Sequence, residues 1–384
     1  RERSLIARFG RGVTARPWLT GGVATVALVI LALPVFTVQL GSSDAGSNPA
    51  GSTTRQAYDL LAEGFGPGFN GPLIVAVDQT RDGGAAVRVA SAIEGTEGVA
   101  SVAEPAFNEA RDTAVVTVFP TTSPQSTETA SLVHHLRDDV IPGALSDGGA
   151  RAYVGGQTAA FEDIASILQG RQLIFLAVVI GIIFVLITMA FRSVVVAAKA
   201  ALTTALSALA AFGVLVAVFQ HGWGASLIGV DSTGPIESFL PVIVFAILFG
   251  LSTDYEVFIM SRIREEHVAG HSASRSIDRG IAAIGKVVVA CALIMCSVFF
   301  SFLLGDQRAI KEFGLGLGAA IAIDAFVVRM VIVPAVMQFL GDRAWCRPAW
   351  LERIMPRVTI EASTEPAAAA PRPIPPGEPV ADTD

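Results

Sequence analysis

Long apolar segments alternate with shorter polar ones along the chain, and a polar insert of domain size separates the first apolar segment from the rest. A helix needs about 20 apolar residues to cross the hydrocarbon core of a bilayer, and each apolar segment is close to that length or longer. The pattern therefore predicts an α-helical membrane protein with one span, a large polar domain and five more spans within residues 173–340. The predicted spans are residues 18–38, 173–191, 194–219, 238–260, 286–304 and 315–340.

The first apolar segment has two possible interpretations, a signal peptide or a retained anchor. Residues 1–16 contain five arginines and one glutamate, and both classes share this basic-then-apolar order. The apolar part of a signal peptide usually has about 7–15 residues, fewer than residues 18–38, and no Ala-x-Ala cleavage pattern follows. We therefore expect a membrane anchor preceded by a cytoplasmic basic segment, residues 1–17.

The polar insert, residues 39–172, alternates strand-like and helix-like stretches. Runs rich in β-branched residues predict strands, and Ser126 followed by Glu128 is typical of a helix start. The order strand, helix, strand, strand, helix, strand matches a ferredoxin-like split βαβ unit. The fold class is thus a helical membrane protein with an α+β ferredoxin-like external domain. The expected strands are 73–77, 99–103, 114–119 and 151–154, and the expected helices are 55–63, 85–93 and 126–140.

A helical stretch at residues 157–169 continues without a break into the span at 173–191. A continuous helix of this kind can be a mechanical connector between the insert and the membrane. It can equally be a plain domain linker, and the sequence leaves both interpretations open.

The charges of the loops orient the spans. Lys and Arg near span ends stay on the cytoplasmic side. Residues 261–285 contain four arginines, and so does the terminal segment 341–360, whereas loop 220–237 contains no Lys or Arg. We therefore expect a multi-pass plasma-membrane protein with residues 39–172 outside the cytoplasm and both termini inside, and with Lys199 snorkelling to the cytoplasmic interface. The tail, 361–384, is rich in Ala, Pro and acid and is expected to be disordered.

Composition excludes several function classes. The chain is 52% hydrophobic and 16% charged, against about 25% charged residues in soluble domains. No basic face for nucleic acid stands out, and none of the three cysteines lies in the polar insert, so no disulfide framework is implied. The chain has no Walker motif, and His134 and His135 lack the spacing of a metal site. We expect no cofactor, and an ion gradient or a partner as the energy source.

An aspartate interrupts the fourth apolar segment. Counted from Ser238 at about 1.5 Å per residue, Asp254 lies about 24 Å along a helix, inside hydrocarbon about 30 Å thick. A carboxylate there costs about 2.5–3.5 kcal/mol on insertion scales, so a functional role is the default hypothesis. A static, hydrogen-bonded aspartate that holds helices together is the alternative.

Asp254 is followed by Tyr255, whose hydroxyl can donate to a carboxylate or accept from a carboxylic acid. Adjacent residues on a helix point about 100° apart, so the two side chains cannot face each other. Each is expected to meet a group on a neighbouring helix. Such a pair is suited to relaying protons.

Five more polar residues within spans are candidates for the same relay or for its support. Glu256 is either an interfacial or structural charge or a proton-entry group. Asp324 is either a relay member or a structural polar contact. Arg329 lies five residues later, about 140° around a helix, so it is not expected to pair with Asp324 and is interpreted as an anchor to a carbonyl or carboxylate. Ser297 and Ser301, four apart on one face, either solvate the relay or permit close helix packing.

Three stretches resemble the MMPL family (mycobacterial membrane protein, large) of the resistance–nodulation–division (RND) superfamily. The sequence GLSTDYEVFIMSRIREEH is similar to the family's fourth-of-six span, KEFGLGLGAAIAIDAFVVRMVIVP to its last span, and GFGPGFNGPLIVAV to the start of its second porter domain. The basic segment and tail after the sixth span favour the C-terminal half. The resemblance covers the chain up to about Arg357 and implies an RND half-transporter.

The family resemblance implies proton-driven export of lipids or other hydrophobic molecules, with Asp254 and Tyr255 as one half of a relay built between two halves. The expected partner is an N-terminal half with its own Asp-Tyr span, or a second half-transporter. Because the sequence begins with Arg1 and not Met, we expect a truncated product.

Two other function classes use the same features. A lipid- or sterol-sensing receptor could share the architecture, and dependence on a proton gradient would separate it from a pump. An intramembrane aspartyl protease could use Asp254 and Asp324 as a dyad. The residues before the two acids, LST and IAI, differ from the glycine-flanked patterns of such proteases.

Overall fold

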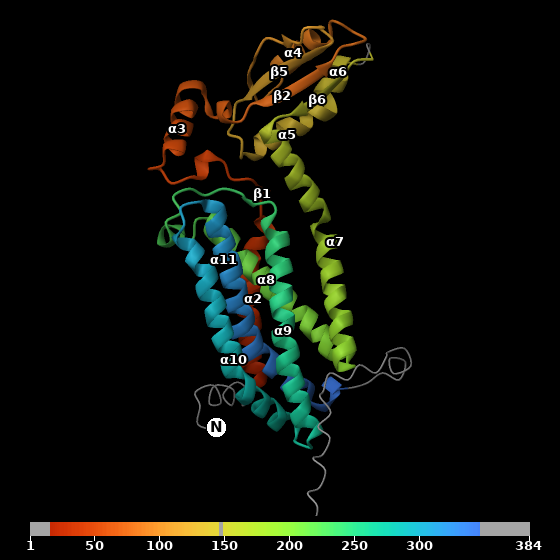
Figure 1. The fold of residues 1–384 in the computed structure, drawn as a ribbon, viewed down its shortest axis with the longest axis vertical. Helices are drawn as coiled ribbons and strands as arrows, with labels where there is room; N and C mark the ends of the chain where they lie inside the picture. The colour runs from red at the N-terminus through yellow and green to blue at the C-terminus, as the bar shows by residue number, and fades with distance from the viewer. Residues whose placement is uncertain (1–15, 146–148, 346–384) are drawn as a thin grey trace, which may run out of the picture.

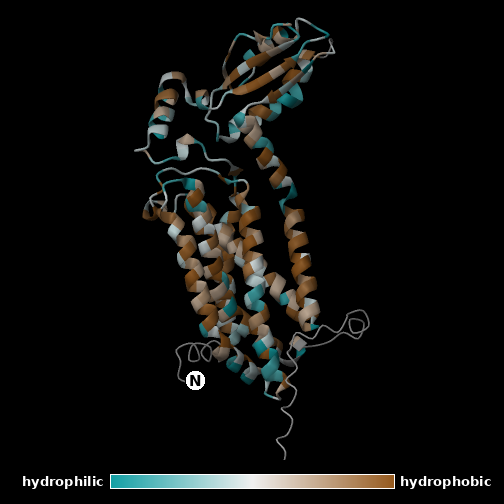
Figure 2. Cartoon of the chain, viewed as in Figure 1, coloured by the Kyte–Doolittle hydropathy of each residue, from teal (hydrophilic) through white to brown (hydrophobic). Residues whose placement is uncertain are grey.

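The computed structural model describes residues 16–145 and 149–345, which form a long helical bundle with a smaller sheet domain at one end (Figure 1). Nearly all of the predicted basic segment 1–17, most of the segment 341–360 and the whole tail 361–384 lie outside the described residues. Hydrophobic residues dominate the bundle, whereas polar residues are more frequent in parts of the sheet domain and at the opposite end of the bundle (Figure 2).

Six helices in the described part of the chain are long and apolar enough to cross a membrane. Each predicted span overlaps one of them almost completely, and only residue 38 of the first span and residues 238–239 of the fourth lie outside. Two helices begin earlier than predicted, α10 at Ala273 and α11 at Arg308, because their first turns carry polar residues that the apolar pattern leaves out. The α9 helix also continues past the predicted end at residue 260, to Val268. The helices are α2 (Pro17–Ala32, extended by the 3-10 turn η1, Leu33–Thr37), α7 (Gln157–Phe191), α8 (Val194–Leu215, extended by the π-helix η5, Val216–Gln220), α9 (Leu240–Val268), α10 (Ala273–Ser301) and a last helix made of α11 (Arg308–Ala322), the π-helix η8 (Ile323–Ile332) and α12 (Val333–Leu340).

The α8 helix lies in the middle of the bundle, and most of its side chains are buried. Its small residues allow neighbouring backbones to come close, as is common between membrane helices. A Cβ added to Gly213 would lie 1.7 Å from the carbonyl oxygen of Leu31 in α2, so only glycine fits there. This contact fixes α2 against α8.

The sheet domain contains every strand and helix predicted between residues 73 and 154. Its four main strands are antiparallel in the order β3-β5-β2-β6, and the short β4 pairs with β5. Alternate residues of β2 and β5 are buried against α4 and α5, which gives the domain its own core. The elements are β2 (Leu73–Asp78), α4 (Ala85–Glu94), β3 (Val99–Val102), β4 (Ala106–Phe107), β5 (Thr113–Pro120), α5 (Thr127–His135), the π-helix η4 (Leu136–Val140), α6 (Ile141–Leu145) and β6 (Arg151–Gly155).

A single helix, α7, connects the sheet domain to the bundle, as predicted for residues 157–191. Its first turns are tied to the sheet domain, because Arg137 pairs with Asp163 and also donates to the carbonyl of Val154 at 2.8 Å. Below these turns α7 stands apart from the other helices before it rejoins the bundle (Figure 1).

A second connection, which we call the neck, consists of residues 39–45 after the first span. Within it, β1 (Leu40–Gly41) pairs in parallel with β7 (Ile236–Glu237), a strand just before α9 that the sequence analysis did not predict. Beyond the neck, α3 (Thr53–Phe65) begins at a Ser52 cap and lies beside the sheet domain (Figure 1). The sheet domain is therefore connected to the bundle on two sides, through the neck and through α7.

Candidate functional site

Five polar side chains from three helices meet inside the bundle, and we call them the ion network. They are Lys199 of α8, Ser252 and Glu256 of α9, and Asp324 and Arg329 of η8. Each is at most 6% exposed. Ser252 and Glu256 are four residues apart and therefore share one face of α9.

Glu256 lies between two basic side chains. The Nζ of Lys199 donates to its Oε1, and the guanidinium of Arg329 pairs with its Oε2. The expectation that Lys199 snorkels to the cytoplasmic interface was wrong, whereas the interpretation of Glu256 as a structural charge fits its two buried ion pairs. The side chain of Lys199 is directed from α8 toward α9, where its charge meets an acid instead of the interface.

Asp324 and Arg329 pair directly. The Nε of Arg329 lies 3.3 Å from Oδ2 of Asp324, and Ser252 Oγ lies 3.1 Å from Oδ1. The expectation that these two residues do not pair was wrong, because they lie in a π-helix and not in an α-helix. In a π-helix the backbone hydrogen bond joins residues five apart, so residue 329 comes round to the face of residue 324.

Arg329 also holds α9. Its Nη2 donates to the backbone carbonyl of Ser252 at 2.8 Å. The prediction that Arg329 anchors to a carbonyl or a carboxylate is confirmed, since it does both. A further hydroxyl, that of Thr204 in α8, lies 3.3 Å from Ser252 Oγ and extends the network to the central helix.

The formal charge of the ion network is balanced, with two basic groups and two acids. Buried charges are tolerated only when they are paired and hydrogen-bonded. Protonation of Glu256 or Asp324 would leave one cation without a counter-charge and weaken a contact between helices. The arrangement can therefore convert the arrival of a proton into a change in how α8, α9 and the last helix pack.

Asp254 and Tyr255 lie outside this network. Asp254 is exposed on the surface of α9 and makes no hydrogen bond or ion pair with any residue that the structure describes, and Tyr255 is half-buried. Asp254 lies two residues from Ser252 and from Glu256, which places it on the opposite face of the helix. Because Asp324 is buried against Arg329 and Asp254 is exposed, the two aspartates do not form a protease-like dyad in this chain.

Ser297 and Ser301 are also separate from the network. Both are exposed on α10, and their hydroxyls donate to carbonyls of their own helix, at 2.7 Å to Ile294 and 2.6 Å to Val298. The structure therefore does not bring them to the buried acids. Their role in solvating a relay stays a prediction, and it would require a partner that covers this surface.

Sequence reasoning missed Ser252, Thr204 and the partnership of Lys199. A signal for Lys199 was present, because a lysine within an apolar span needs either an interface or a counter-charge. Its sequence position alone does not say which of the two it meets. The two hydroxyl residues carry no comparable signal, since Ser and Thr are common in close-packed membrane helices.

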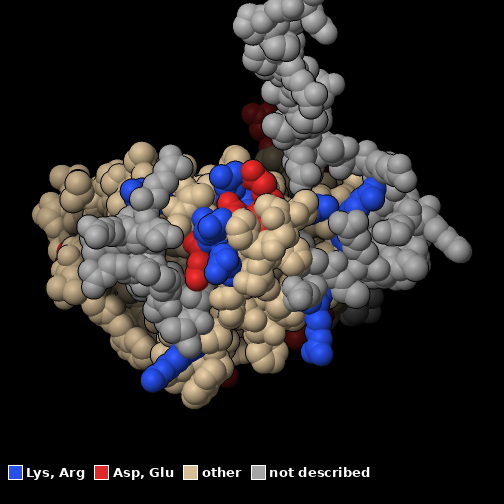
Figure 3. Space-filling model, turned by 90° about the horizontal axis from the view of Figure 1, so that it is seen from below, with Lys and Arg blue, Asp and Glu red and all other residues tan. Residues whose placement is uncertain are grey.

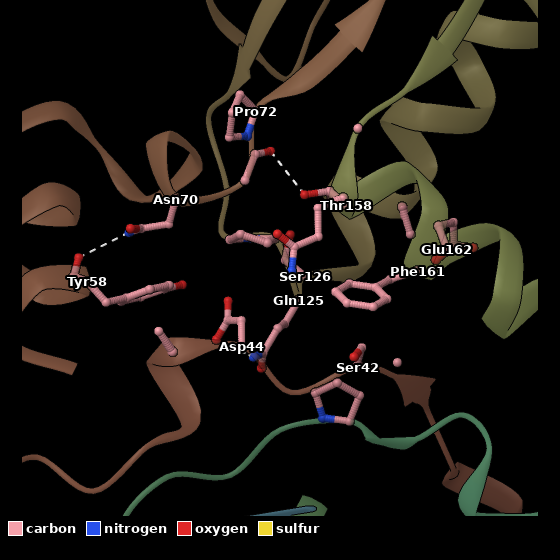
Figure 4. A pocket seen from close by; sticks show the side chains of 18 of the residues that line it. Ser42, Asp44, Tyr58, Asn70, Pro72, Gln125, Ser126, Thr158, Phe161 and Glu162 are labelled. Atoms are coloured by element: carbon pink, nitrogen blue, oxygen red, sulfur yellow. Dashed lines mark hydrogen bonds between the residues drawn. The ribbon is translucent and has the colours of Figure 1, made fainter. Parts of the chain in front are cut away.

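A cavity of about 600 Å³ lies where the neck, α3, α7 and the sheet domain meet. Its lining, part of which Figure 4 shows, contains many hydroxyl and amide groups, two carboxylates and no Lys or Arg. We call it the junction pocket. Polar residues of its lining include Gln39, Ser42, Asp44, Tyr58, Asn70, Gln125, Ser126, Thr158 and Glu162.

The acid at the base of the junction pocket is Asp44. Its Oδ1 accepts the backbone N–H of Gly46 at 2.8 Å and the side-chain amide of Gln125. Burial raises the pKa of Asp44 despite these hydrogen bonds. Burial, together with the charge of Asp44, raises the pKa of Tyr58 to about 12. Tyr58 therefore stays a neutral hydroxyl beside the acid.

Comparison with known proteins finds relatives over nearly the whole chain. It is 38% identical over 358 residues to membrane protein YdfJ of Bacillus subtilis, covering 92% of this chain and 49% of that protein. It is 33% identical to the mycolic acid-containing lipids exporter MmpL11 of Mycolicibacterium smegmatis, covering 92% and 38%, and 29% identical to the trehalose monomycolate exporter MmpL3 of the same organism, covering 94% and 36%. The chain thus spans about half or less of the length of these relatives.

The resemblance seen in the sequence is confirmed by a match to the model of the MMPL family over residues 73–368. That match includes the main sheet, the ion network and the last five of the six apolar helices. The chain is a multi-pass membrane protein that belongs to the MMPL family of transporters.

Proposed function

We propose that this chain is one half of a transporter that uses the proton gradient across the plasma membrane to export lipids or other hydrophobic compounds. The observation that carries the proposal is the ion network, in which two acids and two bases from three helices are buried together. Two relatives named as lipid exporters support the cargo class. No cofactor and no enzymatic step are part of the proposal.

In this mechanism the proton is taken up by a carboxyl of the bundle. Protonation of Asp324 or Glu256 frees Arg329 or Lys199 from its counter-charge, and the helices shift until the cation finds another acceptor. Release of the proton on the cytoplasmic side restores the original packing. Each proton moved would thus drive one cycle of packing change.

A partner half would complete the relay. Asp254 is exposed on α9 at membrane depth, where an aspartate costs about 2.5–3.5 kcal/mol on insertion scales. A second half that offers a tyrosine hydroxyl or another donor would lower that cost and bring Asp254, Tyr255, Ser297 and Ser301 into contact with it. That half is either an N-terminal part of the same protein or a separate half-transporter. The chain's coverage of half or less of its relatives fits both cases.

The proposed orientation places the sheet domain outside the cytoplasm. The opposite end of the molecule carries basic and acidic side chains (Figure 3), and its arginines include Arg262 and Arg264 of α9 and Arg275 and Arg279 of α10. The loop 220–237, at the sheet-domain end, contains no Lys or Arg. This asymmetry favours a cytoplasmic location for the basic end and for both termini.

Residues 39–172, which include the sheet domain, are proposed to form a ferredoxin-like porter domain. The βαββαβ order and the antiparallel sheet β3-β5-β2-β6 support this assignment. Its task would be to guide cargo from the outer leaflet of the membrane.

The junction pocket is the proposed entry point for cargo. It lies between the sheet domain and the bundle, where the neck, α3 and α7 meet. With two carboxylates, several amides and hydroxyls and no basic side chain in its lining, it suits an uncharged, hydroxyl-rich head group or a cationic one, and it disfavours an anionic one. An acyl tail could lie against the exposed apolar side chains of α7 nearby, such as Ile164 and Ile167.

Transport into or out of sealed membrane vesicles tests the function. Vesicles containing the full transporter are given an imposed pH gradient, and the movement of a fluorescent glycolipid and of a fluorescent phosphatidylglycerol is followed. We expect gradient-dependent movement of the glycolipid that an uncoupler stops. Transport that continues without a proton gradient would contradict the proposal and would favour a sensor or another energy source.

A further inference from the structure

A second cluster of buried charges lies at the outer end of the bundle, far from the ion network. Arg308, Lys311 and Glu312 occupy the first turns of α11, and Glu237 belongs to β7. All four side chains are buried, and Glu312 is fully so. We call them the outer cluster. The mechanism proposed above assigns it no role.

Two bases of the outer cluster hold the connection between α8 and α9. The Nη2 of Arg308 donates to the carbonyls of Phe219, Gly234 and Pro235 at 2.7–3.2 Å. The Nζ of Lys311 donates to the carbonyls of residues 228 and 229, at 2.8 Å and 2.6 Å. One carbonyl at the end of η5 and four of the loop that follows it are therefore fixed to the start of the last helix.

Two acids carry the contact on to the neck. Glu312 pairs with Arg308 at 3.0 Å through one oxygen, and its other oxygen accepts the backbone N–H of Glu237 at 3.0 Å. The carboxylate of Glu237 in turn accepts the backbone N–H of Ser43 at 2.7 Å. The β1–β7 pairing runs alongside these bonds. The last helix is thus connected to the neck by buried, charge-assisted hydrogen bonds, which are the stronger kind.

The neck is one wall of the junction pocket. Residues 39–42, Asp44, Ala45 and Pro235 all line that cavity. Twelve residues along the same last helix from Glu312, about 18 Å at the rise of an α-helix, lies Asp324 of the ion network. One continuous helix therefore contacts the ion network near its middle and the wall of the junction pocket at its outer end.

We propose that Arg308, Lys311 and Glu312 are positioning residues that couple the charge state of the ion network to the shape of the junction pocket. When Asp324 gains a proton and Arg329 is released, the last helix moves along or about its axis. The outer cluster moves the loop 220–239 and the neck with it, and the pocket changes its access to solvent. This coupling rests on the proposed function. The coupling can nevertheless be disproved while the proposed function still holds.

The test measures access to the neck while the ion network is switched by mutation. In the full transporter, Cys291, Cys296 and Cys346 are replaced by alanine, and Ser42, a half-buried residue of the pocket lining, is replaced by cysteine. The rate of reaction with a membrane-impermeant maleimide reports pocket access. Asp324→Asn mimics the protonated acid. We expect it to change the rate by about fivefold or more, a typical allosteric coupling.

The coupling is then interrupted at Glu312. Glu312→Met keeps the shape but removes both acceptor oxygens, so the response to Asp324→Asn should disappear. Glu312→Gln keeps one acceptor for the N–H of Glu237 and should restore part of the response. Lys311→Met provides a second interruption, and Asp306→Asn, an exposed acid at the same helix end, is the matched control that should leave the response intact. Unchanged thermal unfolding identifies the variants that fold.

A full response in folded Glu312→Met and Lys311→Met would overturn the coupling, and so would the absence of a response to Asp324→Asn with the outer cluster intact. Neither result touches the proposed function, because gradient-dependent transport in vesicles is measured separately.

Discussion

The Nε of Arg329 lies 3.3 Å from the carboxylate of Asp324, although five residues separate them on one helix. On an α-helix the two side chains would point about 140° apart. The π-helical turns of Ile323–Ile332 bring them onto one face, and such turns occur frequently at functional sites. The ion pair and the unusual backbone therefore depend on each other.

Replacing Arg329 with lysine should impair transport even though the charge is kept. The planar guanidinium contacts Asp324, Ser252 and Glu256 at once, whereas an ammonium group is a point charge that cannot reproduce this fork. We expect transport to fall by about tenfold or more, equivalent to about 1.4 kcal/mol. Vesicle transport normalised to the amount of folded protein measures this. Wild-type rates in Arg329→Lys would contradict the assigned geometry.

Removing Glu256 should destabilise the bundle. Glu256→Ala leaves Lys199 and Arg329 buried with one acid between them, and the loss of one partner of a buried pair costs about 3–5 kcal/mol. Unfolding of the purified protein in detergent measures this cost.

The double variant Lys199→Met, Glu256→Gln restores charge balance. It should be less destabilised than the sum of its single variants by about 0.5–3 kcal/mol, the usual size of coupling between contacting residues. Simple additivity would show that the two groups are independent and would contradict the network.

Asp254→Asn should abolish transport and leave stability nearly unchanged. Asp254 is exposed and makes no hydrogen bond or ion pair with the described residues, so the change in free energy of unfolding should stay within about 0.5 kcal/mol. Asp231→Asn, at an exposed loop position, is the matched control and should transport normally. Proton-coupled export that survives in Asp254→Asn would show that this acid is not part of the relay.

Asp44 should make the protein less stable as the pH rises above about 4. Burial raises its pKa above the ordinary value of 3.8, so the folded state binds the proton more tightly than the unfolded state does. At pH values between the pKa of the unfolded state and the higher pKa of the folded state, the folded state holds more protons. Stability therefore falls as the pH increases through this range. Asp44→Asn removes this dependence and still offers an oxygen to the N–H of Gly46. The difference in melting temperature between wild type and Asp44→Asn, followed from pH 4 to pH 7, should shift in favour of the variant.

Gly213→Ala should be strongly destabilising. The new methyl group would lie 1.7 Å from the carbonyl oxygen of Leu31, so α2 and α8 must separate, at a cost of about 3 kcal/mol or more. Gly181→Ala in α7 has open space around the new methyl and should be neutral or slightly stabilising. Equal melting temperatures for the two variants would contradict the close packing of α2 on α8.

The architecture could be predicted because its signals are local. Apolar runs mark the spans, and alternating or periodic patterns mark the strands and helices of the insert, as with residues 73–77 and β2. The extension of α10 back to Ala273 could not be predicted from hydropathy, since its first turns are amphipathic and lie at the basic end of the bundle.

The ion network could be predicted only in part. Its acids were recognised as costly in a membrane, but their partners are set by how three helices rotate against each other, which the sequence does not express. The π-helix is the clearest case, because a single wider turn reverses the expectation for Asp324 and Arg329. The outer cluster was missed for the same reason. Its basic side chains donate hydrogen bonds to backbone carbonyls, and these acceptors cannot be recognised from residue type.

The length of α7 has a mechanical consequence. Its 35 residues make a rod of about 53 Å, whereas the hydrocarbon core of a bilayer is about 30 Å thick. Roughly 20 Å of it therefore stand clear of the membrane core, and a tilt of about 5° at its base would carry the sheet domain sideways by about 5 Å. Small rearrangements of the buried helices could in this way be magnified into a displacement as wide as an acyl chain.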